Sequence, residues 1–232
     1  MPRLPLALLA RLFALFLVCA AALAQAAGLD AISSRDASAG VKEALAKGAD
    51  VAIATLGKKD GFLGNARVKI PLPGALQKAE KGLRLLGMGK QADELVAAMN
   101  HAAENAVAEA KPILSEAIKK MSVRDAKEIL TGGDDSVTQY FRRSSAEPLT
   151  QKFLPIVKAA TGKLQLAEQY NSVAGRAASL GLIDGKDADI NAYVTQKAMD
   201  GLFLMIAEEE KKLRANPLAA GSSLLKKVFG AL

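Results

Sequence analysis

The chain has almost none of the residue types on which metal sites and nucleophilic sites most often depend. It contains one cysteine, one histidine and no tryptophan. Cysteine thiolates form disulfides, attack substrates and bind metals, but the single cysteine, Cys19, lies in an N-terminal segment that we expect to be removed. The mature protein is therefore expected to have no disulfide, no thiolate nucleophile and no cysteine-bound metal.

The lack of a second histidine limits the remaining chemistry. Every serine–histidine–aspartate triad and every histidine-containing zinc site would have to use His101. On a helix, His101 shares a face with Glu104 and Asn105, which provides only the beginning of a metal site. Because zinc usually takes three or four nitrogen, sulfur or oxygen ligands, we predict no metal site, no cofactor and no catalytic residue.

The longest stretch without a charge lies near the N-terminus and has the pattern of a secretory signal peptide. Arg3 and Arg11 supply positive charge, residues 12–23 are apolar, and Ala24-Gln25-Ala26 fits a cleavage site, as does Ala22-Leu23-Ala24. A lipoprotein signal needs a small residue before the cysteine, where this chain has Val18. We therefore predict a signal peptide over residues 1–26, cleavage near Ala26, and a periplasmic protein with a single domain over residues 27–232.

No later segment is apolar for long enough to cross a membrane. The longest run, GLFLMIA at residues 201–207, is far shorter than the ~20 residues of a spanning helix. Removing Arg3 and Arg11 lowers the formal charge from +7 to +5. A modestly basic protein can contact anionic lipid headgroups or acidic proteins. Nucleic acid is not an expected partner, since aromatic residues are few and export separates the protein from cytosolic DNA.

Most of the mature chain has apolar residues at helical spacing. From Val41 to Leu56 they recur every three or four positions, with Ser38 as a candidate N-cap and Gly57 as a stop. Ser122 and Asp125 resemble a capping box. The fold class predicted is all-α, a single bundle of about eight to ten helices, with further helices over residues 75–86, 91–110, 112–121, 149–160, 164–180, 190–214 and 223–229.

One segment, DGFLGNARVKIPLP at residues 60–73, does not have helical spacing. Arg67 and Lys69 alternate with Val68 and Ile70, and two prolines follow. We expect an extended arm that lies on the helices. Its basic side is either solvated or a contact surface for a partner or an anionic polymer.

The stretch LTGGDDSVTQYFRR at residues 130–143 concentrates glycine, acid, aromatic and arginine residues. Gly132 or Gly133 is expected to end a helix in the left-handed conformation, and Asp134 or Asp135 is expected to cap the next helix. This interpretation leaves Arg142, Arg143 and Tyr140 as candidates for binding an anion or an acidic neighbour. Adjacent arginines lie about 100° apart on a helix, so they cannot both point the same way.

Three other polar or amphipathic segments have structural interpretations. The turn-like DGKDAD at residues 184–189 fails the calcium-loop pattern, and we expect Asp189 to cap the following helix. The segment AEEEKKLR, with Glu208–Lys212 and Glu210–Arg214 pairs at spacing four, is typical of a solvated helix surface. The terminal SSLLKKVFGAL is amphipathic, which suits docking on the bundle or lying on a membrane.

Five long segments resemble one family. GFLGNARVKIPLP, AMNHAAENAVAEAKPI, LTGGDDSVTQYFRR, LTQKFLPIVKAAT and YVTQKAMDGLFLMIAEEEKKLRANP are similar to the motifs of domain-of-unknown-function family 4197. The resemblance extends over about residues 29–229. It implies a periplasmic, mainly helical protein exported by Gram-negative bacteria, and it implies no catalytic residues.

These observations favour a non-catalytic binding protein. Its helices would hold an apolar or anionic lipid-like ligand or contact an envelope protein, with Arg142, Arg143, Tyr140, Arg67 and Lys69 as candidate binding residues. The first alternative is a protein-interaction module that acts through the basic arm or the C-terminal helix. The second is a hydrolase that uses Asp134 and Asp135, although two acids adjacent in sequence rarely face one substrate.

Overall fold

The computed structural model describes residues 33–133, 135–181, 188–216 and 222–229. The predicted signal peptide lies outside these residues. The predicted all-α class is confirmed, because the described residues form nine helices and no strand. The helices are α2 (Ser34–Leu56), α3 (Gly74–Leu85), α4 (Gly89–Ala108), α5 (Lys111–Lys120), α6 (Val123–Thr131), α7 (Ser136–Thr161), α8 (Gln165–Ser179), α9 (Ile190–Ala215) and α10 (Ser223–Phe229).

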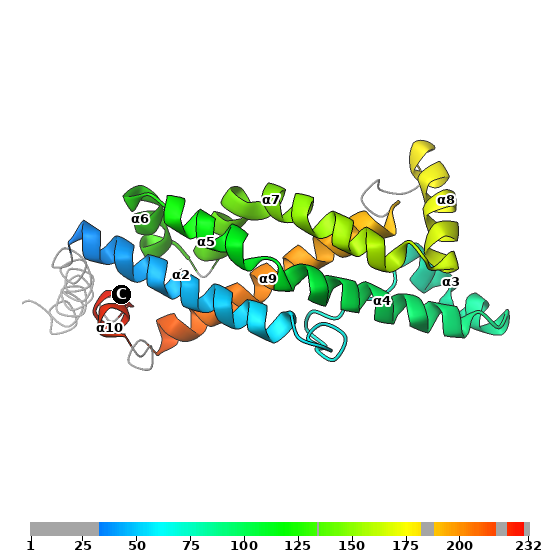
Figure 1. The fold of residues 1–232 in the computed structure, drawn as a ribbon, viewed down its shortest axis with the longest axis horizontal. Coiled ribbons are helices and arrows are strands. Elements are labelled where there is room, and N and C mark those ends of the chain that lie inside the picture. Colours follow the sequence, from blue (N-terminus) through cyan, green and yellow to red (C-terminus); the bar gives the residue numbers. More distant parts are fainter. Residues whose placement is uncertain (1–32, 134, 182–187, 217–221, 230–232) are drawn as a thin grey trace, which may run out of the picture.

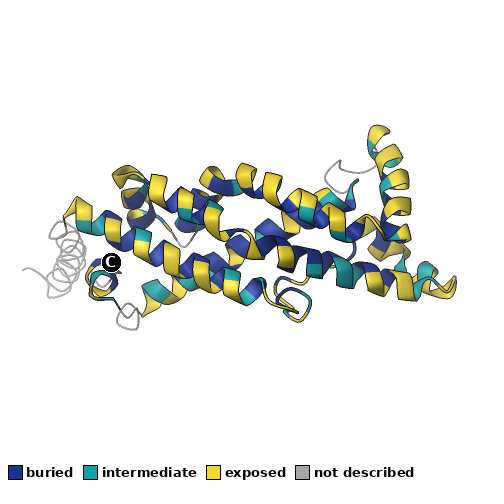
Figure 2. Cartoon of the chain, in the orientation of Figure 1, coloured by how far each residue is buried: buried dark blue, intermediate teal, exposed yellow. Residues whose placement is uncertain are grey.

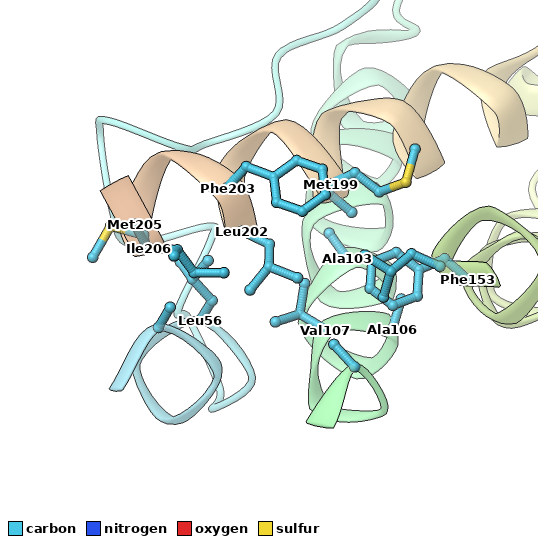
Figure 3. Close-up of a cluster of buried hydrophobic side chains, with 14 of the residues drawn as sticks. Leu56, Ala103, Ala106, Val107, Phe153, Met199, Leu202, Phe203, Met205 and Ile206 are labelled. Atoms are coloured by element: carbon cyan, nitrogen blue, oxygen red, sulfur yellow. The ribbon is translucent and has the colours of Figure 1, made fainter. Parts of the chain in front are cut away.

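The long helix α9 lies at the centre of an elongated bundle (Figure 1). It packs against α2, α4 and α7, and α4 also packs against α7. Figure 3 shows side chains from these four helices meeting in one cluster, with Leu56 from α2, Val107 from α4, Phe153 from α7 and Leu202 from α9. All four side chains are fully buried. Their burial in one shared core holds the long helices together.

Small residues let these helices approach closely. The predicted stripe is fully buried, with Leu95, Met99, Ala102 and Ala106 on α4. Its last member, Ala110, lies beyond the end of α4 and is the N-cap of α5. On α9, a Cβ added to Gly201 would lie 2.7 Å from the ring of Phe62 in the arm. Glycine at this position therefore allows the phenyl ring to rest directly on the helix backbone.

The predicted arm is anchored to the bundle, but it is extended only in part: residues 60–64 and 66–68 form turns, and residues 69–73 follow them without turns. Its apolar side is buried through Phe62, Ile70 and Leu72. The side chain of Asn100 on α4 pairs with the arm backbone as a neighbouring strand would: Ile70 N–H donates to Asn100 Oδ1, and Asn100 Nδ2 donates to Ile70 C=O, both at 2.8 Å. The Tyr193 hydroxyl donates to Pro71 C=O at 3.2 Å. An arm without a partner strand thus finds backbone hydrogen bonds among helical side chains.

Two predicted helix starts are wrong by several residues. The N-cap of α2 is Ser33, which accepts from Asp36 N–H, whereas the predicted cap Ser38 is buried inside the helix. A separate helix was predicted from residue 149, but α7 continues from Ser136 to Thr161 through Pro148 and Pro155. Both prolines are exposed. Water can therefore bond the carbonyl groups that a proline leaves without an intrahelical partner.

The two ends of the elongated bundle are built differently (Figures 1 and 2). At one end α10 packs on α2, burying Leu225 and Val228, so the docked alternative for the C-terminal segment is confirmed. At the other end lie α3, α8 and the turn between α3 and α4. Within the described part of the chain, no helix combines the length and the apolar character of a membrane span.

Candidate functional site

The turn between α6 and α7 is built on a close approach of its backbone, not on a left-handed glycine. Neither Gly132 nor Gly133 has a positive φ, so that prediction is wrong. Gly132 is extended, with φ −82° and ψ 168°. A Cβ there would lie 2.6 Å from Glu128 C=O and 2.7 Å from Ser136 Cβ, so the start of α7 can pass close to the end of α6 only beside a glycine.

Of the two acids of the turn, Asp135 is the one that the structure describes. Asp135 occupies the N-cap position of α7, as predicted, but its side chain makes no capping hydrogen bond. The carboxylate is exposed and accepts a hydrogen bond from Gln139 Nε2 at 3.3 Å. Asp134 lies outside the described residues. Ser136 ties the turn together instead, because its hydroxyl donates to Ile129 C=O at 3.0 Å.

The predicted binding residues of α7 contact three different neighbours. Tyr140 is buried and donates its hydroxyl to Ala117 C=O of α5 at 2.6 Å. Burial raises the pKa of this tyrosine above its usual value. Arg142 pairs with Asp200 of α9 at 3.1 Å and lies 5.2 Å from the centre of the Phe203 ring. Arg143 lies 3.8 Å from Glu128 of α6. The two arginines therefore diverge, as their helical spacing requires, and both have acidic partners within the fold.

The two basic residues of the arm are also separated from α7. Arg67 pairs with Glu208 of α9 at 2.6 Å, and its second nitrogen approaches the Met205 sulfur at 3.5 Å. Lys69 is exposed beside a groove whose other lining residues come from the arm, α3 and α4. The structure therefore does not gather the five predicted binding residues into one pocket.

A buried ion pair on α9 was missed in the sequence. The pattern of AEEEKKLR predicts a solvated surface, but Glu210 is buried and Arg214 nearly so. Their side chains meet at 2.7 Å, and the Arg214 guanidinium also donates to Ile129 C=O at 2.7 Å. Glu208 was predicted to pair with Lys212, four residues later, but it pairs with Arg67 instead. Only the position of Arg214 against the α6–α7 turn distinguishes this pair from an exposed one.

A second anchor lies after α2, where the buried Glu104 of α4 holds a turn. Its two carboxylate oxygens accept three backbone hydrogen bonds, from Asp60, Phe62 and Leu63, at 3.0–3.2 Å. Asp60 has a positive φ of 60°, which aspartate tolerates better than most residues. The sequence reasoning assigned Glu104 only to the face of His101 and did not find this role.

Asp60, His101 and Glu104 are also the one group of possible metal ligands among the described residues. One ligand atom from each lies within 4.8 Å of the others, and His101 Nε2 is 3.4 Å from Asp60 Oδ1. However, the three backbone N–H groups already occupy the Glu104 carboxylate. The arrangement is therefore explained by anchoring of the turn, with His101 and Asp60 at its exposed edge.

An apolar groove opens between α3 and α8, at the end of the bundle opposite α10. It has a volume of about 300 Å³. The lining comes from the first turn of α3 and from one face of α8, and consists of Ala75, Leu76, Leu166, Gln169, Tyr170, Val173, Ala174 and Ala177. None of these side chains carries a formal charge. The groove can hold an apolar group, and its polar lining side chains are Gln169 and Tyr170.

The lining of this groove continues along α8 as an apolar stripe. Leu166, Tyr170, Val173, Ala177 and Leu180 follow one another at spacings of four and three, which places them on one side of the helix. Leu166 and Tyr170 are buried at the base of α8, whereas Val173 is 70% exposed and Leu180 is 73% exposed. The outer half of the stripe is thus without a covering element among the described residues.

Comparison with known proteins agrees with the resemblance of the sequence motifs. No curated protein and no solved structure matches the chain. A family model described as "Protein of unknown function (DUF4197)" matches residues 31–230, which is most of the 232-residue chain. The protein therefore belongs to the DUF4197 family.

Proposed function

We propose that this protein is a non-catalytic binding protein of the cell envelope that takes an apolar, lipid-like chain into the groove between α3 and α8. The observation that carries the proposal is the uncharged lining of a groove of about 300 Å³, open to solvent and bordered by the exposed Val173. Ligand sites are concave, mostly apolar and of about this size or larger. A contiguous exposed apolar surface often marks a binding site.

The charges of the fold give no comparable support to a site at Arg142 and Arg143. Each arginine lies beside a carboxylate, Asp200 or Glu128, so an anion would have to displace or tolerate a negative neighbour. The arginines act as links between α7 and its neighbours in this proposal. The ligand is held by burial of apolar surface, and no residue acts as an acid, base or nucleophile.

The export signal supports the same function. Lipids are the abundant apolar molecules of an envelope, and the N-terminal pattern predicts delivery to the periplasm. The proposal therefore joins two expectations, the location and the ligand class, that can be tested separately.

The test is binding of a fluorescent fatty-acid analogue to the purified mature protein. Val173→Glu places a charge in the groove and, because Val173 is largely exposed, leaves the core intact. We expect at least about tenfold weaker binding, since a charge is costly to bury without a partner. Val123→Glu, at an exposed position outside the groove, is the matched control and should bind as the native protein does.

Equal binding by the two variants would show that the groove is not the site. Native mass spectrometry and lipid extraction of the protein purified from the periplasm provide a second measurement. Recovery of protein without any bound small molecule, together with no binding of the analogue, would contradict the function itself.

A second candidate function is favoured by the spacing along α8. Alternating intervals of four and three residues are those of a seam between packed helices, so a helix of an envelope protein is an alternative occupant of the groove. The basic arm and α10, which the sequence suggested as contact surfaces, both pack on the bundle through their apolar sides. Crosslinking in intact cells distinguishes a partner helix in the groove from a partner at α10. A crosslinked protein neighbour that is lost in Val173→Glu, but kept when residues 223–232 are removed, would support a partner helix in the groove.

A further inference from the structure

The turn between α3 and α4 exposes two adjacent leucines at the end of the molecule. Leu85 is 89% exposed and Leu86 is 78% exposed, the highest values among the large apolar residues of the described chain. The turn between α3 and α4 lies at the extremity of the elongated bundle that is opposite α10 (Figure 1). Single exposed leucines are ordinary, but two at a projecting tip form an apolar surface that requires an explanation.

The conformation of the turn keeps these leucines outside. Gly87 has a φ of 78°, and Met88 N–H donates to Leu83 C=O at 2.8 Å, which is the hydrogen bond of a Schellman motif. Leu83 and Met88 are partly buried and pack against the core. The two apolar residues that can turn inward are therefore Leu83 and Met88, and Leu85 and Leu86 remain on the outer side.

Ion pairs of Arg84 link the two helices that flank the tip. Arg84 of α3 bonds Glu80 at 2.9 Å and reaches across the turn to Asp93 of α4 at 2.8 Å. These acids raise the pKa of Arg84, and Arg84 holds the pKa of Asp93 below its usual value. The two exposed leucines thus lie in a turn whose flanking helices are joined by an ion pair.

Two basic residues lie on the same face of α3 as Leu85, closer to the start of the helix. Lys78, Lys81 and Leu85 follow at spacings of three and four, so they point to one side of the helix. With a rise of 1.5 Å per residue, the lysines lie about 10 Å and about 6 Å above Leu85 along the helix axis. No described carboxylate pairs with either lysine, whereas Arg84 is already balanced by Glu80 and Asp93. Lys90, on the α4 side, lies 3.7 Å from Glu94.

We propose that this tip docks the protein on an anionic phospholipid surface. Leu85 and Leu86 enter the interface between headgroups and acyl chains, and Lys78 and Lys81 contact headgroup phosphates. The separations fit a bilayer, because interfacial apolar groups penetrate about 5–10 Å below the charged groups. A convex tip with two large apolar side chains suits a bilayer better than a protein partner, which needs about 800 Å² on each side.

Docking through the tip would also bring the proposed groove close to the membrane. α3 ends at the tip and begins at the α3/α8 groove, so a protein docked through the tip carries the groove near the membrane. This inference concerns the membrane surface and does not depend on a ligand in the groove. The two proposals can therefore fail independently.

The experiment measures binding of the mature protein to vesicles that contain phosphatidylglycerol and to vesicles of phosphatidylcholine alone. We expect binding to the anionic vesicles that weakens as salt is raised. Leu85→Glu/Leu86→Glu should reduce partitioning by at least about tenfold, as loss of two buried leucines implies, and Lys78→Glu/Lys81→Glu should remove the preference for anionic vesicles. The matched control is Val123→Glu/Leu204→Glu, which changes two exposed apolar residues elsewhere on the surface and should bind normally.

Because the chain has no tryptophan, Leu86→Trp adds a single fluorescent reporter at the tip. Its emission should shift to shorter wavelength on anionic vesicles, whereas Leu204→Trp should show no shift. Equal vesicle binding by the tip and control variants, or no shift at position 86, would overturn the proposal. A tip variant that loses vesicle binding but still binds the fatty-acid analogue would leave the groove proposal intact. A Val173→Glu variant that loses the analogue but still binds anionic vesicles would leave the tip proposal intact.

Discussion

The guanidinium of Arg214 joins three parts of the chain that lie far apart in the sequence. It pairs with Glu210 on α9, donates to Ile129 C=O at the end of α6, and lies 3.3 Å from the Ser136 hydroxyl at the start of α7. Arg124 and Glu128 on α6 have the same spacing of four residues, but both are largely exposed. Identical spacing therefore produces a buried anchor in one helix and a solvated pair in the other.

We expect Arg214→Ala to lower the free energy of unfolding by about 2 kcal/mol, because it removes a charged partner of the buried Glu210 carboxylate and a hydrogen bond to Ile129 C=O in the α6–α7 turn. Arg124→Ala should change it by less than about 0.5 kcal/mol. Urea unfolding of the two variants measures the difference. Similar effects in both would contradict the role given to Arg214.

At the scale of elements, the start of α6 shows how capping depends on pH. Ser122 N–H donates to Asp125 Oδ2 at 2.9 Å, and Asp125 N–H donates to Ser122 Oγ at 3.1 Å, so the predicted capping box is confirmed. The hydrogen bonds from the Ser122 side chain and backbone lower the pKa of Asp125. Asp189 likewise caps α9 as predicted, accepting from Asn191 and Ala192 N–H.

Replacing Asp125 by asparagine should reduce stability at neutral pH by about 0.5 kcal/mol, because the amide oxygen can still accept a hydrogen bond but the negative charge near the N-terminus of α6 is lost. A carboxyl group whose pKa is lower in the folded state stabilises the fold above its unfolded pKa of about 3.9, and this contribution disappears as the pH falls through the folded pKa. The difference between native protein and variant should therefore shrink below about pH 4. Thermal unfolding across pH tests this, with Asp135→Asn as a control because Asp135 makes no capping bond.

The docking of α10 depends on a single glycine of α2. A Cβ at Gly40 would lie 2.6 Å from Val228 Cγ2, whereas one at Gly48 would lie 3.6 Å from its nearest neighbour. Lys227 adds an ion pair with Asp36 at 2.8 Å. The C-terminal helix thus covers a particular site on α2.

Gly40→Ala should displace α10 and cost about 1–3 kcal/mol through overpacking, while Gly48→Ala should be neutral or stabilising by up to about 1 kcal/mol because alanine favours the helix. Limited proteolysis reports the release of α10 as faster cleavage before residue 223. Unchanged cleavage in Gly40→Ala would show that α2 can shift to accept the methyl group.

At the scale of the whole molecule, the sequence predicts an exported protein. Residues 1–26 have the pattern of a signal peptide, and cleavage after Ala26 would leave a chain with a net charge of +5. Intact-mass measurement of the protein from the periplasmic fraction should give a chain that begins at Ala27. A variant with Ala24 and Ala26 replaced by large residues should accumulate as the uncleaved precursor. Full-length protein in the cytoplasm would contradict the predicted location.

The sequence by itself determined the helical class, the stripes of α2 and α4 and two caps. These features depend on neighbours within a few residues, and a spacing of 3.6 residues or a cap at a helix start is visible without any other part of the chain. The arm was also predictable, because glycine, proline and alternating residues exclude a helix locally.

Only the tertiary structure decided which polar groups are buried and which apolar groups are exposed. Glu104, Asn100 and Arg214 became anchors because segments distant in sequence bring backbone groups to them. Arg142 and Arg143 became links to α9 and α6, while Leu85, Leu86 and Val173 remained outside. The physical reason is that burial is a property of packed helices, and residue spacing defines a helix face without defining what covers it.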